Sequence, residues 1–243
     1  MIKPVRALLL ILLISGCSTT EKVEIKQPAF TEQEIENATL TEDTKIAELL
    51  DQHREGYRAE MGSVLTMIEE PLIFGKPESS LGNIVADALR YRASREALQL
   101  VHIGIIGDGS FRLNLNQGPL TMGDVYEFMP YENHLVMLKL TGDQVLELAD
   151  QIAEQGGSPI SGMRFQLENN RARGVIVNSQ VVSSNQEYWV ATSNYVADGG
   201  DNFPVLWEAQ ERIDFDLSIK ELYVDHFRNR KMAEPFKDGR IRQ

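Results

Sequence analysis

The side chains best suited to hold a metal ion are the four histidines, at positions 53, 102, 134 and 226. Asp51 and His53 form an Asp-x-His pair, a spacing that can serve a metal, but both fall in a stretch with helical periodicity. Side chains two residues apart on a helix diverge, so this pair is poorly placed to share one ion. The histidines show neither a His-x-His nor a His-Glu-x-x-His spacing. The sequence therefore predicts no metal site and no catalytic residue in this chain.

Two further patterns of catalytic or cofactor chemistry are incomplete. Gly107-Asp108-Gly109 follows an apolar run, but the third glycine of a dinucleotide-binding loop is missing. The sequence also lacks a Gly-x-Ser-x-Gly segment, which would place a nucleophilic serine at a strand-to-helix turn. We therefore expect neither a cofactor in this chain nor a serine nucleophile.

The start of the chain has the order of a bacterial secretory leader. Two positive charges in residues 1–6 precede an apolar run over residues 7–14, and small residues lead to Cys17, the one cysteine. Residues 14–17, Ile-Ser-Gly-Cys, resemble the lipobox of bacterial lipoproteins. The resemblance implies that residues 1–16 are a signal peptide and that Cys17 carries lipid chains. A plain signal peptide that ends in Cys and an uncleaved anchor are the alternatives.

A lipidated Cys17 would anchor the protein to a membrane without a spanning helix. Because Ser18 rather than Asp follows it, the resemblance to Gram-negative sorting implies the outer membrane, with the protein facing the periplasm. In a Gram-positive source it would lie on the cell surface. Residues 17–40 are polar and acidic, which predicts a flexible tether, and residues 41–243 form the predicted domain.

The chain is acidic, with 24 Lys and Arg against 36 Asp and Glu and a formal net charge of −12. A surface of this sign is poorly suited to the phosphate backbone, so we expect no nucleic-acid partner. Hydrophobic residues make up 42% and charged residues 25%, a balance typical of a globular protein of this length.

Apolar periodicity and turn signals predict both helices and strands along the domain. Helices are expected over residues 42–60, from a cap at Ser79 or Ser80, and over residues 121–129, 141–154 and 214–230. Strands are expected over residues 64–68, 99–106, 135–140, 163–167, 175–177 and 188–192. This order predicts an α/β fold of the mixed α+β kind, a single layered domain of mixed sheets flanked by helices.

Four segments in a fixed order carry the most specific pattern. They are Glu78-Ser79-Ser80-Leu81-Gly82-Asn83 with Asp87-Ala88, Gly109-Ser110-Phe111-Arg112, Pro130-Tyr131-Glu132-Asn133, and Asn194-Tyr195 with Gly199-Gly200-Asp201. The series resembles the C-terminal domain of the 5'-nucleotidase family, which includes UDP-sugar hydrolases and 2',3'-cyclic phosphodiesterases. The likeness covers roughly residues 45–230 and implies the fold of that domain.

The resemblance implies a site for a nucleotide or nucleoside. In the family two aromatic rings sandwich the base, and the matching positions are Tyr131 and Tyr195, which we expect to face each other across a cleft. Stacking of this kind contributes about 1–3 kcal/mol per base. Asn133 matches the position whose amide reads the base edge. The alternative is that both tyrosines are core aromatics.

Further positions imply contacts with the sugar and phosphate. Asp201 matches a carboxylate that holds the ribose hydroxyls, and Arg112 matches a guanidinium that meets the phosphate or nucleoside. Gly199 and Gly200 match glycines that let the backbone approach the ligand. The sequence departs from the family pattern at Lys76, where Arg is common.

In the family the chemistry belongs to a separate metallophosphoesterase domain with two metal ions. Only the predicted tether precedes the first helix here, so the resemblance implies the substrate-binding half of a split nucleotide hydrolase, inactive alone. A separate metallophosphoesterase chain would then carry the divalent metals. The alternatives are a non-catalytic lipoprotein that scavenges or senses nucleotides, and a surface interaction protein with a decayed pocket.

Overall fold

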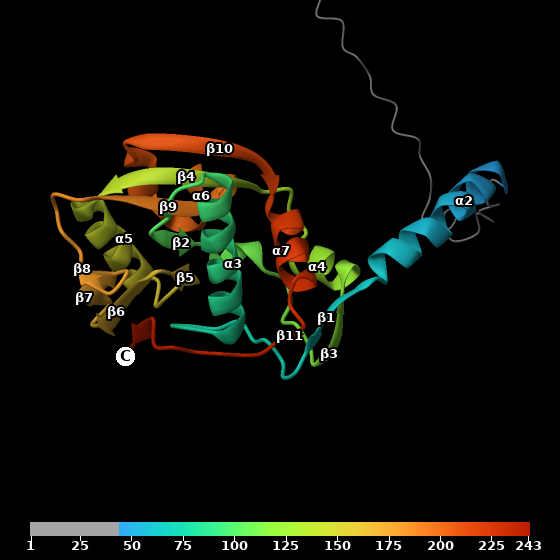
Figure 1. The fold of residues 1–243 in the computed structure, drawn as a ribbon, viewed down its shortest axis with the longest axis horizontal. Coiled ribbons are helices and arrows are strands. Elements are labelled where there is room, and N and C mark those ends of the chain that lie inside the picture. Colours follow the sequence, from blue (N-terminus) through green and yellow to red (C-terminus); the bar gives the residue numbers. More distant parts are fainter. Residues whose placement is uncertain (1–43) are drawn as a thin grey trace, which may run out of the picture. The chain divides into compact units, whose positions relative to one another are not determined.

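The computed structural model describes residues 44–243 (Figure 1). The predicted signal peptide over residues 1–16, the lipidation of Cys17 and the tether over residues 17–40 lie outside the described residues. Contacts along the chain place Glu48–Gln243 in one compact unit and Met1–Ala47 outside it. Within residues 44–243, every helix is too short or too polar to cross a membrane.

Helices and strands alternate irregularly along the described chain. The helices are α2 (Thr44–Met61), α3 (Ser80–Glu96), η1 (Asp108–Ser110), α4 (Met122–Phe128), α5 (Gly142–Glu154), α6 (Asn194–Ala197), η2 (Gly200–Asn202), η3 (Pro204–Glu208) and α7 (Ile219–Arg228). The strands are β1 (Val64–Ile68), β2 (Ile103–Ile105), β3 (Gly118–Thr121), β4 (His134–Thr141), β5 (Ile160–Ser161), β6 (Met163–Glu168), β7 (Arg171–Val177), β8 (Gln180–Val181), β9 (Glu187–Ser193), β10 (Glu211–Ser218), β11 (Met232–Ala233) and β12 (Ile241–Arg242).

The strands form three sheets. A five-stranded sheet has the order β10-β4-β9-β2-β5, and two smaller sheets have the orders β11-β1-β3 and β12-β6-β7-β8. In the large sheet β2 and β9 are parallel and the other neighbours are antiparallel. Helices pack on both sides of it (Figure 1). The mixed α/β class predicted from the sequence is therefore confirmed.

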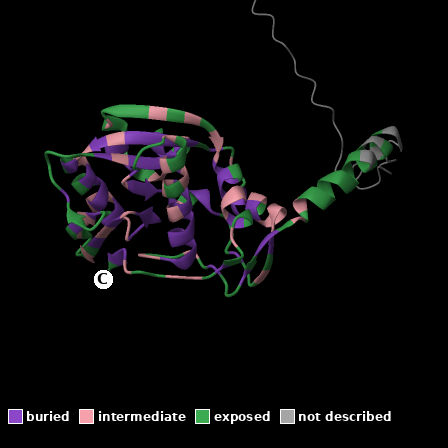
Figure 2. Cartoon of the chain, in the orientation of Figure 1, coloured by how far each residue is buried: buried purple, intermediate pink, exposed green. Residues whose placement is uncertain are grey.

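Both faces of the large sheet are buried, which explains the continuous apolar run of β4. Leu135 and Met137 pack into a core with α3, α4 and α7, whereas Val136 and Leu138 pack into a second core with α5 and the β6–β7 hairpin. Alternate residues of a strand point to opposite faces, so a strand covered on both sides needs apolar residues at every position. Figure 2 shows this buried layer within an exposed rim.

The predicted helix over residues 214–230 is wrong in its first half, where β10 forms instead. Ile213, Phe215 and Leu217 alternate with charged residues, and this period of two suits a strand. β10 pairs antiparallel with β4, and the helix α7 begins only after it. The local alternation was therefore a strand signal that the helix prediction overlooked, and the pairing with β4 stabilises the strand.

Most other predicted elements are confirmed, and the residues predicted to cap two helices do so in the structure. Ser79 caps α3 by accepting a hydrogen bond from the Gly82 N–H at 3.1 Å, and Thr141 caps α5. The strand expected over residues 99–106 shortens to β2. The His102 imidazole explains this, because its Nδ1 rather than a backbone carbonyl accepts the hydrogen bond of a backbone N–H in β9.

Helix α2 confirms the helix predicted over residues 42–60. Three of its apolar side chains, those of Ile46, Leu50 and Tyr57, are exposed. The amphipathic spacing therefore produced a helix on which these three side chains remain largely accessible.

Candidate functional site

The predicted ligand residues leave one edge of the five-stranded sheet. β2 runs parallel to β9, so both strands end at this edge, and β4 runs antiparallel to β9, so it begins there. The register pairs Leu135 near the start of β4 with Ser193 at the end of β9. The segments that emerge together are residues 106–112, 131–133 and 194–201. Loops at one edge of a rigid sheet are a common location for ligand-binding groups.

The start of α7 fixes the segment before β4. The Ile219 N–H donates to the Asn133 carbonyl at 2.8 Å, and the Lys220 ammonium pairs with the Glu132 carboxylate. Lys220 is buried and lies 4.8 Å from the centroid of the Tyr126 ring. These contacts hold the backbone around Asn133, whose side chain is also buried.

Arg112 and Tyr131 come from different segments and meet in space. The Arg112 guanidinium carbon lies 5.1 Å from the centroid of the Tyr131 ring, a cation–π distance. The Arg112 N–H donates to the Phe128 carbonyl at 2.9 Å, which anchors its backbone. Among residues 44–243 the guanidinium has no carboxylate partner, so its donors remain free for an anionic or polar ligand.

Two aromatic rings cover the glycine pair of the last segment. A Cβ atom at Gly200 would lie 2.3 Å from the Tyr195 ring, and one at Gly199 would lie 2.5 Å from the Trp207 ring. Gly199 also has a φ of 105°, which other residues rarely adopt. Tyr195 is 46% exposed and Trp207 is 62% exposed, so both rings remain accessible. No motif in the sequence pointed to Trp207, although it follows the glycine pair closely in the chain.

The Asp201 carboxylate is only partly satisfied. Its Oδ1 accepts a hydrogen bond from the Gly109 N–H at 3.2 Å, whereas its Oδ2 is buried without a hydrogen-bond partner among the described residues. Burial raises the pKa of Asp201. The Gly109 hydrogen bond and Lys76 oppose that rise, and Asp108 adds to it. A Cβ at Gly107 would lie 1.6 Å from Oδ2, so only glycine permits this approach.

Lys76 and Gln155 contact the segments that carry Asp108 and Asp201. Lys76 Nζ lies 2.7 Å from the Asp108 carboxylate and donates to the Gln155 carbonyl at 2.7 Å. The Gln155 amide in turn donates to the Asp201 and Asn202 carbonyls, each at 3.1 Å. Lys76, the departure from the family pattern, therefore lies next to the predicted ligand carboxylate. No sequence signal pointed to Gln155.

The first motif segment has a structural role instead. The Glu78 carboxylate accepts hydrogen bonds from the backbone N–H groups of residues 238–240 at 2.9–3.2 Å. Asp87 forms an ion pair with the buried Arg240 at 2.6 Å. This part of the motif ties the C-terminal segment to α3.

The loop over residues 107–112 connects the two halves of the candidate site. Gly109 reaches Asp201 and Arg112 reaches Tyr131, so the loop contacts both predicted ligand groups. That the two tyrosine rings clasp a base, and that Asn133 reads its edge, stay predictions. Within residues 44–243 no group of three or more His, Cys, Asp or Glu side chains is placed to hold a metal ion.

The chain is similar in sequence to known proteins. The model of the 5'-nucleotidase C-terminal domain matches residues 71–208. The trifunctional nucleotide phosphoesterase protein YfkN of Bacillus subtilis is 28% identical over an alignment of 183 positions that covers 68% of this chain and 12% of that protein. A 5'-nucleotidase of Vibrio vulnificus is 23% identical over an alignment of 199 positions that covers 76% of this chain and 34% of that protein.

Solved structures share the same fold. A 5'-nucleotidase precursor from Thermus thermophilus superposes with a TM-score of 0.69 and 29% identity, covering 82% of this chain and 43% of that one. The NAD nucleotidase of Haemophilus influenzae superposes with a TM-score of 0.63 and 21% identity, covering 82% of this chain and 41% of that one. The chain therefore spans less than half the length of these relatives.

Proposed function

The chain belongs to the family of 5'-nucleotidase C-terminal domains, and we propose that it binds a nucleotide or nucleoside at the sheet edge described above. The observation that carries this proposal is the meeting of Arg112 with Tyr131 beside a loop that also holds Asp201. An accessible ring offers a stacking surface, a free guanidinium suits a phosphate, and an under-satisfied carboxylate suits hydroxyl donors.

The proposed contacts divide the ligand into three parts. Tyr131 and Tyr195 stack on the base while Asn133 reads its edge. Arg112 meets the phosphate, and Asp201 accepts hydrogen bonds from the ribose hydroxyls. The partly unsatisfied carboxylate supports this last assignment, because a ribose hydroxyl would supply the donor that the protein does not.

Titration calorimetry of the full chain with adenosine, AMP, UDP-glucose and adenine tests the proposal. Asp201→Ala is expected to weaken adenosine binding about tenfold or more and adenine binding much less, since only adenosine carries the hydroxyls. Asp198→Ala is the matched control, because this exposed aspartate of the same loop pairs with Arg212. Absence of saturable binding for every one of these compounds would refute the proposal.

We propose further that this chain is the substrate-binding half of a split hydrolase, with a separate metallophosphoesterase chain supplying the divalent metals. Exposed apolar side chains on β1 and β11, those of Val64, Met67 and Met232, support a protein partner. The chain alone, given Mn²⁺, Zn²⁺ or Mg²⁺, is then expected not to hydrolyse AMP. Metal-dependent turnover by highly purified chain would contradict the split arrangement. Nucleotide binding without any such partner would favour scavenging or sensing.

We also propose that lipid chains on Cys17 anchor the protein to a bacterial membrane, with the domain in the periplasm of a Gram-negative cell. Support comes from the lipobox-like residues 14–17. Cys17→Ser removes the thiol that would carry the lipid, so the variant is expected to leave the detergent phase in a partition experiment. Equal partitioning of processed wild type and variant would refute the anchor.

A further inference from the structure

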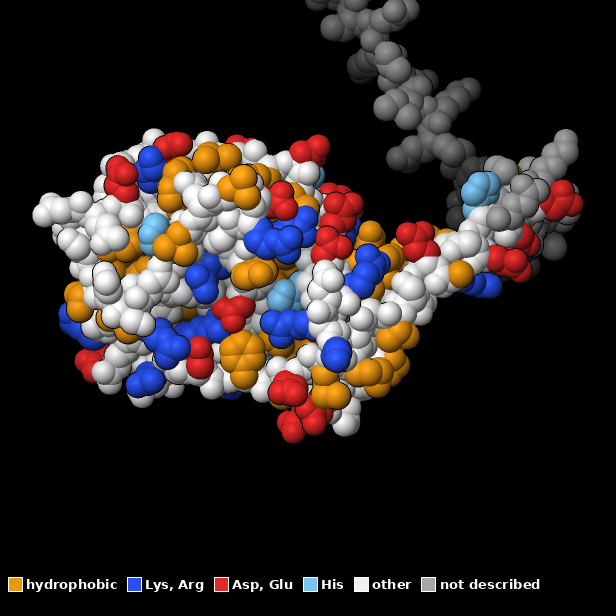
Figure 3. All heavy atoms as spheres, in the orientation of Figure 1, with side chains coloured by type: hydrophobic (Ala, Val, Ile, Leu, Met, Phe, Trp, Pro, Cys, Tyr) orange, Lys and Arg blue, Asp and Glu red, His pale blue; other side chains and the backbone are white. Residues whose placement is uncertain are grey.

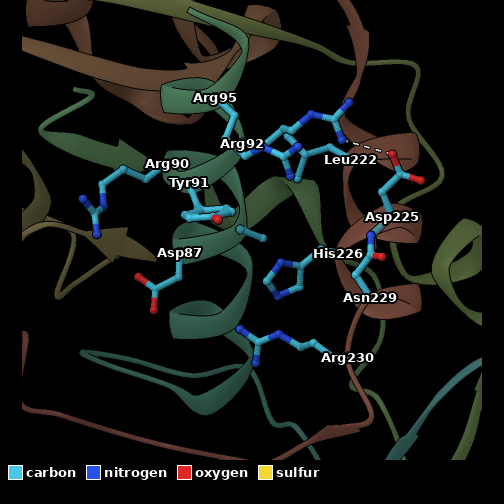
Figure 4. Close-up of a pocket in the computed structure, with 11 residues that line it drawn as sticks. Asp87, Arg90, Tyr91, Arg92, Arg95, Leu222, Asp225, His226, Asn229 and Arg230 are labelled. Carbon is cyan, nitrogen blue, oxygen red and sulfur yellow. Dashed lines mark hydrogen bonds and ion pairs between the residues drawn. The ribbon is translucent and has the colours of Figure 1, made fainter. Parts of the chain in front are cut away.

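A cleft of about 700 Å³ lies between α3 and α7 and shares no residue with the sheet-edge site. Figure 4 shows its lining side chains, which come from the two helices and the residues just after α7. Its volume falls in the range of sites for small organic ligands, about 300–1,000 Å³. On the face in Figure 3, blue side chains gather over these helices.

The cleft is cationic although the chain as a whole is acidic. Four arginines line it: Arg90, Arg92, Arg95 and Arg230. Its two acids are already paired, Asp225 with Arg92 at 3.0 Å and Asp87 with Arg240 at 2.6 Å.

The remaining positive charges of the cleft lack acidic partners. Among residues 44–243, Arg95 and Arg230 have no carboxylate partner. Arg90 donates to the Ser161 hydroxyl at 2.7 Å and forms no direct ion pair with a carboxylate among the described residues. Gathered like charges repel one another, and a bound anion would relieve that repulsion.

The unpaired arginines stand at opposite ends of the cleft. Arg95 comes from α3, whereas Arg230 follows the end of α7. Arg95 lies eight residues beyond Asp87 on α3, about 12 Å along the helix axis. Figure 4 shows the same arrangement, with Arg95 toward one end and Arg230 toward the other.

The middle of the cleft offers neutral groups. Nε2 of His226 is buried and has no hydrogen-bond partner among the described residues. Burial and Arg230 lower the pKa of His226 to about 4, with Asp87 opposing, so the imidazole is neutral at pH 7. The Tyr91 ring is 65% exposed at the rim, and Leu222 adds apolar surface.

From this arrangement we propose that the cleft is a second ligand site, for an elongated small molecule with a phosphate group at each end. Arg95 binds one phosphate and Arg230 the other, because guanidinium groups pair with phosphate through charge-assisted hydrogen bonds. The body of the ligand lies against Tyr91, and one of its hydroxyl or ether oxygens pairs with His226 Nε2. The site is independent of the proposed nucleotide function.

Titration calorimetry of the full chain with fructose 1,6-bisphosphate tests this site, because the probe carries two separated phosphates. Arg95→Gln and Arg230→Gln are each expected to weaken binding about tenfold or more. Arg173→Gln is the charge-matched control, since Arg173 is exposed on β7 outside the cleft, and it should leave the affinity unchanged. Glucose 6-phosphate, with one phosphate, should bind more weakly than the bisphosphate.

Three outcomes would overturn the proposal. The first is no saturable binding of the bisphosphate at low salt. The second is equal affinity for the two sugar phosphates. The third is binding that is lost in Arg112→Gln but retained in Arg95→Gln and Arg230→Gln, which would place the anion at the sheet-edge site instead. Because Arg95 is exposed, Arg95→Gln is expected to keep the wild-type melting temperature, and its binding result then stands even if Arg230→Gln unfolds.

Discussion

Two carboxylates in this chain, those of Asp87 and Asp201, are held in opposite ways. The Asp87 carboxylate accepts hydrogen bonds from both Nη atoms of Arg240, at 2.8 and 2.6 Å, and from the Ser161 hydroxyl. Asp201 receives one backbone N–H, from Gly109, and its other oxygen is buried without a partner among the described residues. Both residues belong to the family-like motif, yet only the first is fully paired by the protein.

The difference separates a structural acid from a candidate ligand acid. Arg240 is buried and Asp87 is partly buried, so removal of either partner would leave the other charge without its ion pair, which destabilises the fold. An acid left short of donors, on backbone with a φ of 55° at Asp201, costs the fold free energy that a ligand could recover. His226 Nε2, in the cleft between α3 and α7, shares this property with Asp201, since it too is buried without a hydrogen-bond partner among the described residues.

The largest effect is expected at the paired acid. Arg240→Ala leaves Asp87 without its partner and removes contacts to the backbone, so the free energy of unfolding should fall by about 3–5 kcal/mol. Urea denaturation at pH 7 measures this loss. Arg173→Ala, at an exposed position on β7, should change stability by less than about 0.5 kcal/mol. A loss below about 1 kcal/mol for Arg240→Ala would contradict the structural role given to Asp87.

The next effect is a dependence of stability on pH through His226. Its pKa is about 4 in the folded chain against 6.5 ordinarily, so the unfolded chain takes up a proton first as the pH falls. The contribution of His226 to the free energy of unfolding is therefore complete above pH 6.5. It is lost as the pH falls from about 6.5 to 4, by up to about 3 kcal/mol. Urea denaturation across this range should show a shallower slope for His226→Gln. An unchanged slope would mean that other groups control the acid sensitivity.

Tyr195→Ala is expected to reduce adenosine affinity by about 1–3 kcal/mol, roughly 5- to 150-fold, because it removes one stacking face. Stability should change little, since the ring is 46% exposed. Calorimetry with adenosine measures the affinity, and Tyr57→Ala on α2 serves as a control at another exposed tyrosine. Wild-type affinity in the Tyr195→Ala variant would contradict the proposed base-binding site beside Asp201.

The smallest effect concerns Asp201 itself. Burial raises its folded pKa above 3.8, so its favourable contribution to stability is present below that pH and is lost as the pH rises through the folded value. Asp201→Asn removes this titration. The stability difference between variant and wild type should therefore move in favour of the variant from about pH 4 to 7. A difference that stays constant with pH would show that the carboxylate is not under-satisfied in solution.

Local signals in the sequence predicted elements whose causes lie within a few residues. The caps at Ser79 and Thr141 involve partners three positions away, so composition alone revealed where α3 and α5 begin. β10 depends on β4, a partner distant in sequence, and was mistaken for helix. The order of the four motif segments indicated the family, because it reflects the whole chain and not one local conformation.

By itself, the sequence determined the mixed α/β class, the starts of α3 and α5 and the residue types of the candidate site. Only the tertiary structure decided which motif residues are paired within the fold and which are left without a partner among the described residues. Asp87 meets Arg240 across 153 positions, and Gly109 meets Asp201 across 92. Whether a buried polar atom is hydrogen-bonded depends on such contacts between residues that are far apart in the sequence. A local sequence pattern does not predict these contacts, because each partner leaves the residues next to the other partner unconstrained.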